Sequence, residues 1–140
     1  MPEEYPKIKV VLVEDDKFLS EVLIFRLKDE GFDAIPVDNG ETAYATIKKE
    51  NPNIVLLDLL LPKKNGFEVL QELKADPVTN PIPVVILSNL GQQTDLDKGR
   101  QLGAVDYLVK ANFSIGDIVA KIKQYLAPKI LFRIESRYER

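Results

Sequence analysis

The chain has 140 residues, of which 45 % are hydrophobic and 29 % are charged, and its formal net charge at pH 7 is −3. This length suits one domain with a single hydrophobic core. The charge balance lacks the basic excess that nucleic-acid binding requires. No apolar stretch approaches the roughly 20 residues of a membrane-spanning helix, and the first residues do not resemble a signal peptide. We therefore expect a cytoplasmic protein that contacts neither nucleic acid nor a membrane directly.

The sequence contains neither cysteine nor histidine. The first absence excludes disulfides, thiolate zinc sites and thiol nucleophiles. The second excludes catalytic triads that use histidine as the base, and also a role as a phosphohistidine carrier. Any chemistry in this chain must therefore come from carboxylates, hydroxyls and lysines.

Apolar, β-branched runs alternate with amphipathic stretches five times along the chain, which predicts five strands that are each followed by a helix. The predicted strands span residues 7–13, 33–37, 53–57, 82–87 and 104–109. The predicted helices span residues 17–30, 41–50, 66–75, 94–102 and 114–126. Pro36 places the second strand at a sheet edge. Thr94 and Asp97 have the spacing of a capping box at the start of the fourth helix.

Strands that alternate with helices of this length predict βαβ units and a parallel sheet covered on both faces. We expect an α/β fold, a doubly wound (βα)5 sandwich of the flavodoxin type with strand order 2-1-3-4-5. One domain is expected over residues 1–127. Residues 128–140 fall outside the pattern and are expected to form a C-terminal tail or linker, with packing or dimerisation as an open role.

Acidic residues stand directly after two of the predicted strands, at the sheet edge where ligands bind in this fold. Glu14, Asp15 and Asp16 follow the first strand, and Asp58 follows the third. Clustered carboxylates repel one another, and a hard cation such as Mg²⁺ relieves the repulsion. The alternative for the first acidic run is a solvated cap for the helix that begins near Lys17. For Asp58 a purely structural role is less favoured, because a lone charge among apolar residues is costly.

A hydroxyl and an ammonium group follow two further predicted strands, namely Ser88 after the fourth and Lys110 after the fifth. With a cation beside it, the Asp58 carboxylate can act as a nucleophile toward phosphorus. The metal and Lys110 would then offset the charge of the transferred phosphoryl group. Taken singly, Ser88 fits a turn residue and Lys110 fits a surface lysine. Because both residues occur together with the acids at the strand ends, we infer a site for phosphoryl transfer.

Four segments together resemble the response-regulator receiver domain of two-component systems, which is CheY-like. They are VVLVEDD (residues 10–16), VLLDLLLPKKNGFEVLQEL (55–73), PVVILSN (83–89) and GAVDYLVK (103–110). The resemblance covers about residues 7–126 and includes the D-x-x-x-P-x-x-x-G spacing of Asp58, Pro62 and Gly66.

The resemblance implies that Asp58 is the phosphoacceptor. It also implies a set of Mg²⁺ ligands: Glu14, Asp15, Asp58 and the backbone carbonyl of Leu60. Ser88 would move to donate a hydrogen bond to the phosphoryl group, and Lys110 would pair with that group.

The same resemblance implies a switch and its partners. Tyr107 would change rotamer as Ser88 moves, although a half-buried strand tyrosine is the plainer alternative. The surface formed by residues 94–126 would bind a downstream effector or a second copy of the chain. A sensor histidine kinase or phosphotransfer protein would supply the phosphoryl group. Beyond accepting that group and losing it again, the chain would not be an enzyme.

One position departs from the family pattern. Receiver domains usually carry a proline in a cis bond after this lysine, whereas Ala111 follows Lys110 here. A cis bond without proline costs about 2.5–4 kcal/mol. The sequence therefore predicts either a trans bond with a reshaped loop or a strained cis bond.

Three alternatives remain open at this point. A haloacid-dehalogenase-type phosphatase would need a second acid two residues after Asp58, where Leu60 stands. A flavodoxin-like FMN protein would need a hydroxyl- and glycine-rich loop after the first strand, where residues 14–16 are acidic. A receiver-like interaction module that works without phosphorylation would not need the acids, the hydroxyl and the lysine together.

Overall fold

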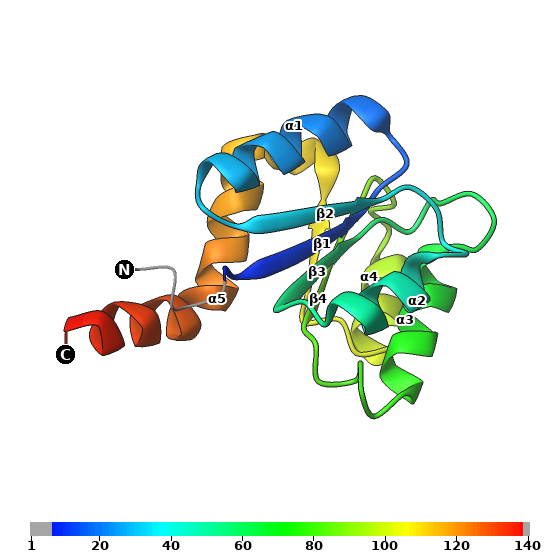
Figure 1. The fold of residues 1–140 in the computed structure, drawn as a ribbon. Helices are drawn as coiled ribbons and strands as arrows, with labels where there is room; N and C mark the ends of the chain where they lie inside the picture. Colours follow the sequence, from blue (N-terminus) through cyan, green and yellow to red (C-terminus); the bar gives the residue numbers. More distant parts are fainter. Residues whose placement is uncertain (1–6, 139–140) are drawn as a thin grey trace.

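The computed structural model describes residues 7–138, with the side chains of residues 7–128 and 130, and strands and helices alternate along it (Figure 1). The strands are β1 (Lys9–Val13), β2 (Asp33–Val37), β3 (Ile54–Leu57), β4 (Val84–Ser88) and β5 (Asp106–Val109). The helices are α1 (Lys17–Asp29), α2 (Ala43–Glu50), α3 (Gly66–Ala75), α4 (Gln93–Gln101) and α5 (Ile115–Tyr138). A 3₁₀ turn, η2 (Lys110–Asn112), joins β5 to α5.

The five strands form one parallel sheet in the order β2-β1-β3-β4-β5, as the sequence predicts. Every residue of β3 and β4 is buried, because helices cover both faces of the sheet. Pro36 lies in the edge strand β2, where its missing N–H costs no ladder hydrogen bond in the sheet interior.

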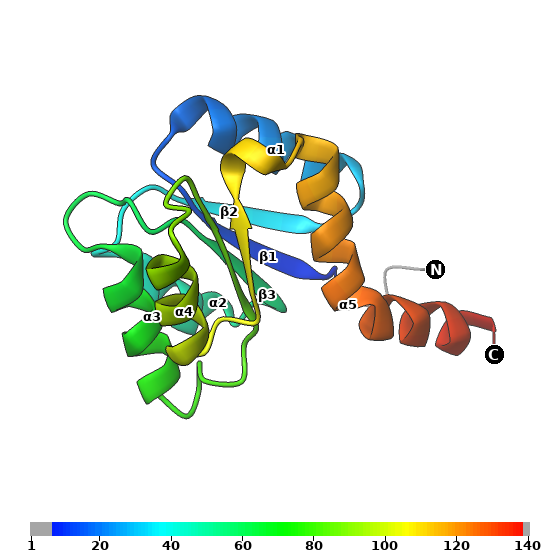
Figure 2. The same ribbon diagram turned by 180° about the vertical axis from the view of Figure 1, so that it is seen from behind.

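Two apolar clusters fill the space between the sheet and its helices. Helices α1 and α5 lie on one face of the sheet, and α2, α3 and α4 lie on the other (Figures 1 and 2). Leu23, Leu27 and Ile122 belong to the first cluster. Val69 and Leu70 belong to the second. This layering leaves the carboxyl ends of the strands uncovered by helices, so that edge of the sheet is open to ligands.

The ends of the two last helices differ from the prediction. Thr94 does not cap α4, because the helix begins at Gln93 and the capping position is Gln92, whose side chain makes no capping hydrogen bond. Helix α5 continues through Pro128 to Tyr138 instead of ending at Leu126. Proline inside a helix lacks a backbone donor and crowds the carbonyl four residues before it. The helix nevertheless continues, and Ile130, in the turn beyond, packs against the first cluster. Residues 128–138 are therefore helical, and residues 139–140 lie outside the described part.

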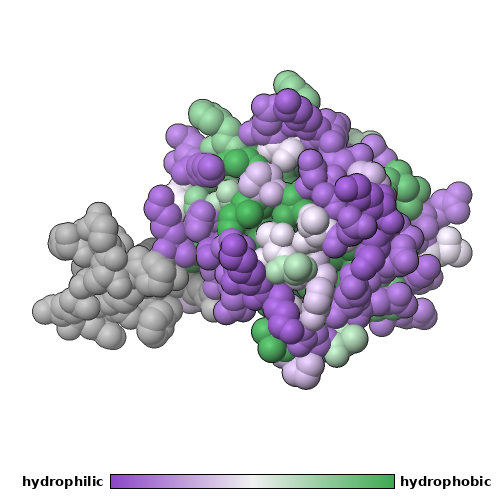
Figure 3. Space-filling model, turned by 45° about the vertical axis from the view of Figure 1, so that its right-hand side comes forward, coloured by the Kyte–Doolittle hydropathy of each residue, from purple (hydrophilic) through white to green (hydrophobic). Residues whose placement is uncertain are grey.

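The outside of the molecule is largely polar. The face drawn in Figure 3 is mostly hydrophilic, with apolar residues in separate small patches. Phe18 and Phe25 on α1 are the most exposed large apolar side chains described, at 78 % and 73 %. Within the described residues, no helix has the length and apolar character needed to cross a membrane.

Candidate phosphoryl and metal site

Strand register brings the predicted acids to one place. Val13 of β1 pairs with Leu57 of β3, so Glu14 and Asp58, the next residue of each chain segment, leave the sheet side by side. Oxygen atoms of Glu14, Asp15 and Asp58 lie within 4.8 Å of one another. Glu14 and Asp58 are only 1 % and 4 % exposed, whereas Asp15 is exposed. The cluster therefore has two buried carboxylates and one that faces solvent.

Lys110 joins the two buried carboxylates. Ser88 of β4 pairs with Val109 of β5, so Lys110 begins its turn at the same edge of the sheet. Its Nζ lies 2.7 Å from Glu14 Oε1 and 2.9 Å from Asp58 Oδ2. One ammonium group thus partly neutralises a pair of carboxylates that burial would otherwise drive toward protonation.

The pKa directions follow from this arrangement. Burial raises the pKa of Glu14 above its ordinary value, and the ion pair with Lys110 and the hydrogen bond from the Asp16 N–H offset part of that rise. For Lys110, burial alone would lower the pKa, but the contacts with Glu14 and Asp58 outweigh it, so the net pKa is raised. Lys110 therefore stays charged at neutral pH.

Backbone donors fix the orientation of Asp58. Its Oδ1 accepts hydrogen bonds from the N–H of Leu59 at 2.7 Å and from the N–H of Leu60 at 3.3 Å. The chain turns back so tightly that a Cβ on Gly66 would stand 2.2 Å from the Asp58 carbonyl oxygen. Glycine at position 66 is therefore required for helix α3 to start against the backbone of Asp58.

Asp16 stands outside the cluster. Its Oδ1 accepts the Leu19 N–H at 3.1 Å and caps α1, while its own N–H donates to Glu14 Oε2 at 3.0 Å. The acidic run after β1 is therefore divided between two tasks. Glu14 and Asp15 face the site, and Asp16 holds the first turn of the helix.

Ser88 and Tyr107 both bond the backbone of one residue, Leu90. Ser88 is fully buried, and its Oγ accepts the N–H of Leu90 at 3.3 Å. The Tyr107 hydroxyl donates to the carbonyl oxygen of the same Leu90. Tyr107 is 7 % exposed and lies inward. Burial, together with the negative charges of Asp95 and Asp58, raises the pKa of Tyr107 to about 12.

Comparison with known proteins identifies the family. A family model described as the response regulator receiver domain matches residues 10–123. The chain belongs to this family. It is thus a receiver domain of a response regulator in two-component signalling, and the predicted fold and resemblance are both confirmed.

Individual relatives agree with this assignment. The receiver domain is 37 % identical, over 86 % of its length and 48 % of the other chain, to a probable transcriptional regulator ycf27 of Porphyridium aerugineum. It spans about half the length of the curated relatives it matches. The Mn²⁺-bound form of response regulator Rcp1 is 38 % identical with a TM-score of 0.69, covering 75 % of this chain and 81 % of that one. The phosphorylated cyanobacterial phytochrome response regulator RcpA is 32 % identical with a TM-score of 0.76, covering 86 % and 94 %.

The acidic cluster of this receiver domain suits a hard divalent cation. Three carboxylates of different burial converge, and oxygen is the ligand that Mg²⁺ prefers. The two buried acids carry more negative charge than Lys110 alone offsets. The carbonyl of Leu60 is a further predicted ligand. Leu60 directly follows Leu59, whose N–H donates to Asp58 Oδ1. The cluster can therefore hold a metal ion.

The Lys110–Ala111 peptide bond is trans, since the described residues contain no cis bond. The following residues form the 3₁₀ turn η2 rather than the proline-containing loop usual in the family. Of the two outcomes that the sequence left open, the trans bond is the one found. Lys110 nevertheless reaches Asp58.

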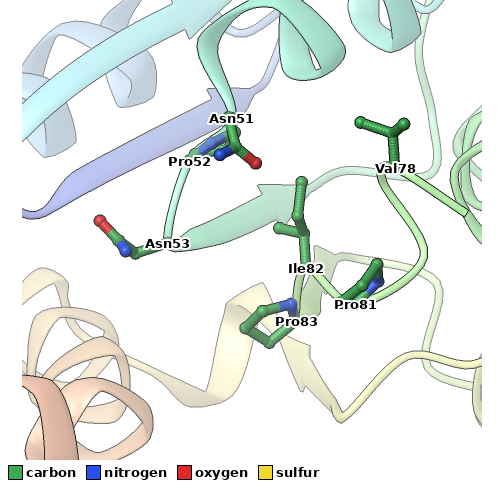
Figure 4. Close-up of a pocket in the computed structure, with 7 residues that line it drawn as sticks. All are labelled: Asn51, Pro52, Asn53, Val78, Pro81, Ile82 and Pro83. Carbon is green, nitrogen blue, oxygen red and sulfur yellow. The ribbon is translucent and has the colours of Figure 1, made fainter.

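A pocket in the receiver domain lies far from these groups. It is lined by Asn51, Pro52, Asn53, Val78, Pro81, Ile82 and Pro83 (Figure 4). These residues precede β3 and β4, so the pocket lies at the amino ends of the strands. Glu14, Asp58 and Lys110 lie at the opposite edge of the sheet.

Sequence reasoning missed two features of the site. It assigned Glu14 to the metal without its ion pair to Lys110. It also did not foresee that the N–H of Leu90 donates to Ser88 while the carbonyl of Leu90 accepts from Tyr107. Neither has a local signal in the sequence, because each depends on how side chains from different strands meet.

Proposed function

We propose that Asp58 accepts a phosphoryl group and that this modification switches the surface formed by residues 94–126. The observation that carries the proposal is the setting of Asp58. This carboxylate is almost completely buried, paired with Lys110 and grouped with Glu14 and Asp15. A buried carboxylate held in this way, next to a candidate cation site, is suited to nucleophilic attack on phosphorus.

In the proposed step, the phosphoryl group is transferred from the donor to Asp58. An Asp58 carboxylate oxygen forms a bond to phosphorus while the bond from phosphorus to the donor breaks, and the donor leaves with that electron pair. The N–H groups of Leu59 and Leu60 keep the carboxylate in position. Lys110 supplies a positive charge close to the developing acyl phosphate.

Glu14, Asp15 and Asp58, with the Leu60 carbonyl, would hold Mg²⁺. When bound, this ion supplies charge neutralisation for the phosphoryl oxygens. The Mn²⁺-bound form of Rcp1 supports a divalent cation at such a site. The phosphorylated form of RcpA likewise supports the modification.

Phosphorylation would reach the surface through Ser88 and Tyr107. The new group adds negative charge and acceptor oxygens beside Ser88. A hydroxyl that turns toward the phosphoryl group releases the Leu90 N–H it now binds. Because Tyr107 holds the same residue by its carbonyl, the change passes to α4, β5 and α5.

The partners follow from the chemistry. The chain has no histidine, so a sensor histidine kinase or phosphotransfer protein would be the donor. Phe18 and Phe25 offer that donor an exposed apolar strip on α1, the helix that begins beside Asp15. A downstream effector or a second copy would bind residues 94–126. We propose no direct nucleic-acid or membrane contact, and no catalysis beyond the chain's own phosphorylation and dephosphorylation.

Intact-mass measurement tests the proposal. The chain is incubated with acetyl phosphate, with and without Mg²⁺, alongside Asp58→Asn. We expect the mass of one phosphoryl group to appear only with Mg²⁺ and only when Asp58 is present. Asp16→Asn is the matched control, because asparagine also caps helices, and it should be phosphorylated like the parent.

Asp15→Asn separates metal binding from transfer. We expect it to raise the Mg²⁺ concentration needed for half-maximal phosphorylation by tenfold or more, because it removes one ligand of the cluster. Equal phosphorylation of the parent and Asp58→Asn would contradict the assignment of Asp58. A folded chain that neither binds Mg²⁺ nor gains mass would favour an interaction module that works without phosphorylation.

A further inference from the structure

The one buried residue of α4 is a glycine. Gly99 lies in the last turn of the helix but before its cap, where glycine is ordinarily unfavourable relative to alanine. A glycine inside a helix therefore calls for a packing reason. The structure supplies one, because the residue stands directly over the sheet and the ring of Tyr107.

The space at position 99 is already filled by its neighbours. A Cβ built on Gly99 would lie 2.7 Å from Ile86 Cδ1 and 3.2 Å from Tyr107 Cδ2. Ile86 is fully buried in β4 and has little room to withdraw. Any larger side chain at position 99 must therefore move the Ile86 methyl group, displace the tyrosine ring or lift the helix.

The inward ring is also tied to the phosphorylation site. Its hydroxyl donates to the Leu90 carbonyl, and the N–H of that residue donates to Ser88 Oγ. Ser88 is the last residue of β4 and lies at the carboxyl edge of the sheet with Asp58. The chain of contacts from Ser88 to α4 is therefore Ser88, Leu90, Tyr107 and Gly99.

We propose that Gly99 is a positioning residue for the switch, which leaves the space that Tyr107 needs to lie inward and bond the Leu90 carbonyl. The role of Tyr107 as a switch rests on the proposed function. The claim that Gly99 sets the orientation of the Tyr107 ring does not depend on that function. The size of the side chain at position 99 sets the orientation of Tyr107. A β-branched residue there drives the ring outward and separates the surface at residues 94–126 from Ser88.

Fluorine NMR tests the placement of the ring. The chain has five tyrosines, which are labelled as 3-fluorotyrosine, and the Tyr107 resonance is assigned with Tyr107→Phe. A soluble gadolinium chelate then broadens the resonances of exposed rings. In the parent we expect Tyr107 to be protected. In Gly99→Val it should lose most of that protection, and Gly99→Ala should lie between the two.

Gly116→Ala is the matched control. This glycine also lies in a helix, the first turn of α5, but a Cβ there would meet nothing nearer than Ser114 Oγ at 3.8 Å. It should leave the Tyr107 resonance unchanged. A second readout is absorbance titration of unlabelled protein, in which the Tyr107 pKa of about 12 should fall toward the ordinary value near 10 in Gly99→Val.

The outcomes are distinct. A protected Tyr107 in folded Gly99→Val would overturn the proposal, because Ile86 or α4 would then have moved instead of the ring. If the valine variant does not fold, an unchanged Tyr107 in Gly99→Ala overturns it equally. Neither measurement uses a phosphodonor or metal, so failure of Asp58 phosphorylation would refute the proposed function alone.

A last comparison tests the coupling. Parent and Gly99→Val are both phosphorylated, and backbone amide shifts of residues 94–126 are recorded. We expect the parent to show changes across this surface and the variant to lose most of them while Asp58 is modified in both. Equal changes in the two proteins would overturn the link between Gly99 and the switch.

Discussion

Helices α3 and α4 lie next to each other on the same face of the sheet, yet they are held to it very differently (Figures 1 and 2). Helix α3 buries Gly66, Val69, Leu70 and Leu73, whereas α4 buries only Gly99. The half-buried Leu96 and Leu102 supply the rest of the apolar contact of α4. The loop after Asp58 thus leads into a firmly anchored helix, and the proposed output surface begins with a loosely anchored one. A helix with little apolar burial is the kind of element that moves at low free-energy cost.

The starts of the two helices differ in the same sense. Asn65 and Glu68 form a capping box at α3, with the Asn65 side chain accepting the Glu68 N–H and the Glu68 side chain accepting the Asn65 N–H. Gln92, at the corresponding position of α4, makes no capping hydrogen bond. The first turn of α4 therefore leaves more of its backbone donors to solvent.

Truncating one leucine in each helix should give the largest contrast. Leu70→Ala removes a fully buried side chain and should lower the free energy of unfolding by about 2–5 kcal/mol. Leu96→Ala removes a half-buried one and should cost less than half as much. Urea unfolding followed by circular dichroism measures both. Similar losses in the two variants would show that α4 is anchored as firmly as α3.

The capping residues should give a smaller effect of opposite sign in the two helices. Asn65→Ala should destabilise the protein by about 1 kcal/mol, because it removes a side-chain acceptor. Gln92→Ser should stabilise it by several tenths of a kcal/mol, since the extended backbone of Gln92 suits a capping residue. Thermal unfolding reports both changes. A destabilised Gln92→Ser would mean that the start of α4 is constrained in some other way.

These contrasts also mark how far the sequence alone could lead. The alternation of apolar runs and amphipathic stretches predicted the strands and helices, because each of them leaves a local pattern. The sheet order followed from the number of strand–helix units, which favours 2-1-3-4-5 among the common doubly wound arrangements. Asp16 was correctly among the residues considered as a cap for α1. The cap predicted at Thr94 was wrong because the Gln92 carbonyl already accepts the first helical bonds from Asp95 and Leu96.

For the site, the sequence placed the acids, the hydroxyl and the lysine at one sheet edge, and the structure brings them there. It did not reveal the ion pair of Glu14 with Lys110, nor the fit of Gly99 over Tyr107. Both join residues from separate elements through side-chain packing. The end of α5 was also missed, because Pro128 indicates a break, whereas the helix continues beyond it and Ile130 packs against the first cluster.

The smallest expected effect on stability concerns Asp76, at the C-terminal end of α3, and its contacts with α2. Asp76, which caps the C-terminus of α3, accepts a hydrogen bond from the Tyr44 hydroxyl and pairs with Lys48 at 2.9 Å, both from α2. The bond from Tyr44, then Lys48 and the Val78 N–H, lower the pKa of Asp76 to about 2. An ordinary aspartate in the unfolded chain has a pKa near 3.9.

The sign of the pH dependence follows from that difference. Because the folded pKa is the lower one, the stabilisation by Asp76 is fully present above about pH 4 and is lost as the pH falls through about 2. Asp76→Asn should therefore be less stable than the parent at pH 7, and the difference should shrink as the pH is lowered from 4 to 2. Urea midpoints across this range measure it, with Asp97→Asn on α4 as the control, since that carboxylate accepts only from Gln93 of its own helix. A gap between parent and Asp76→Asn that stays constant down to pH 2 would show that the carboxylate does not tie α3 to α2, and would reduce the contrast with α4 to core packing and the N-terminal cap.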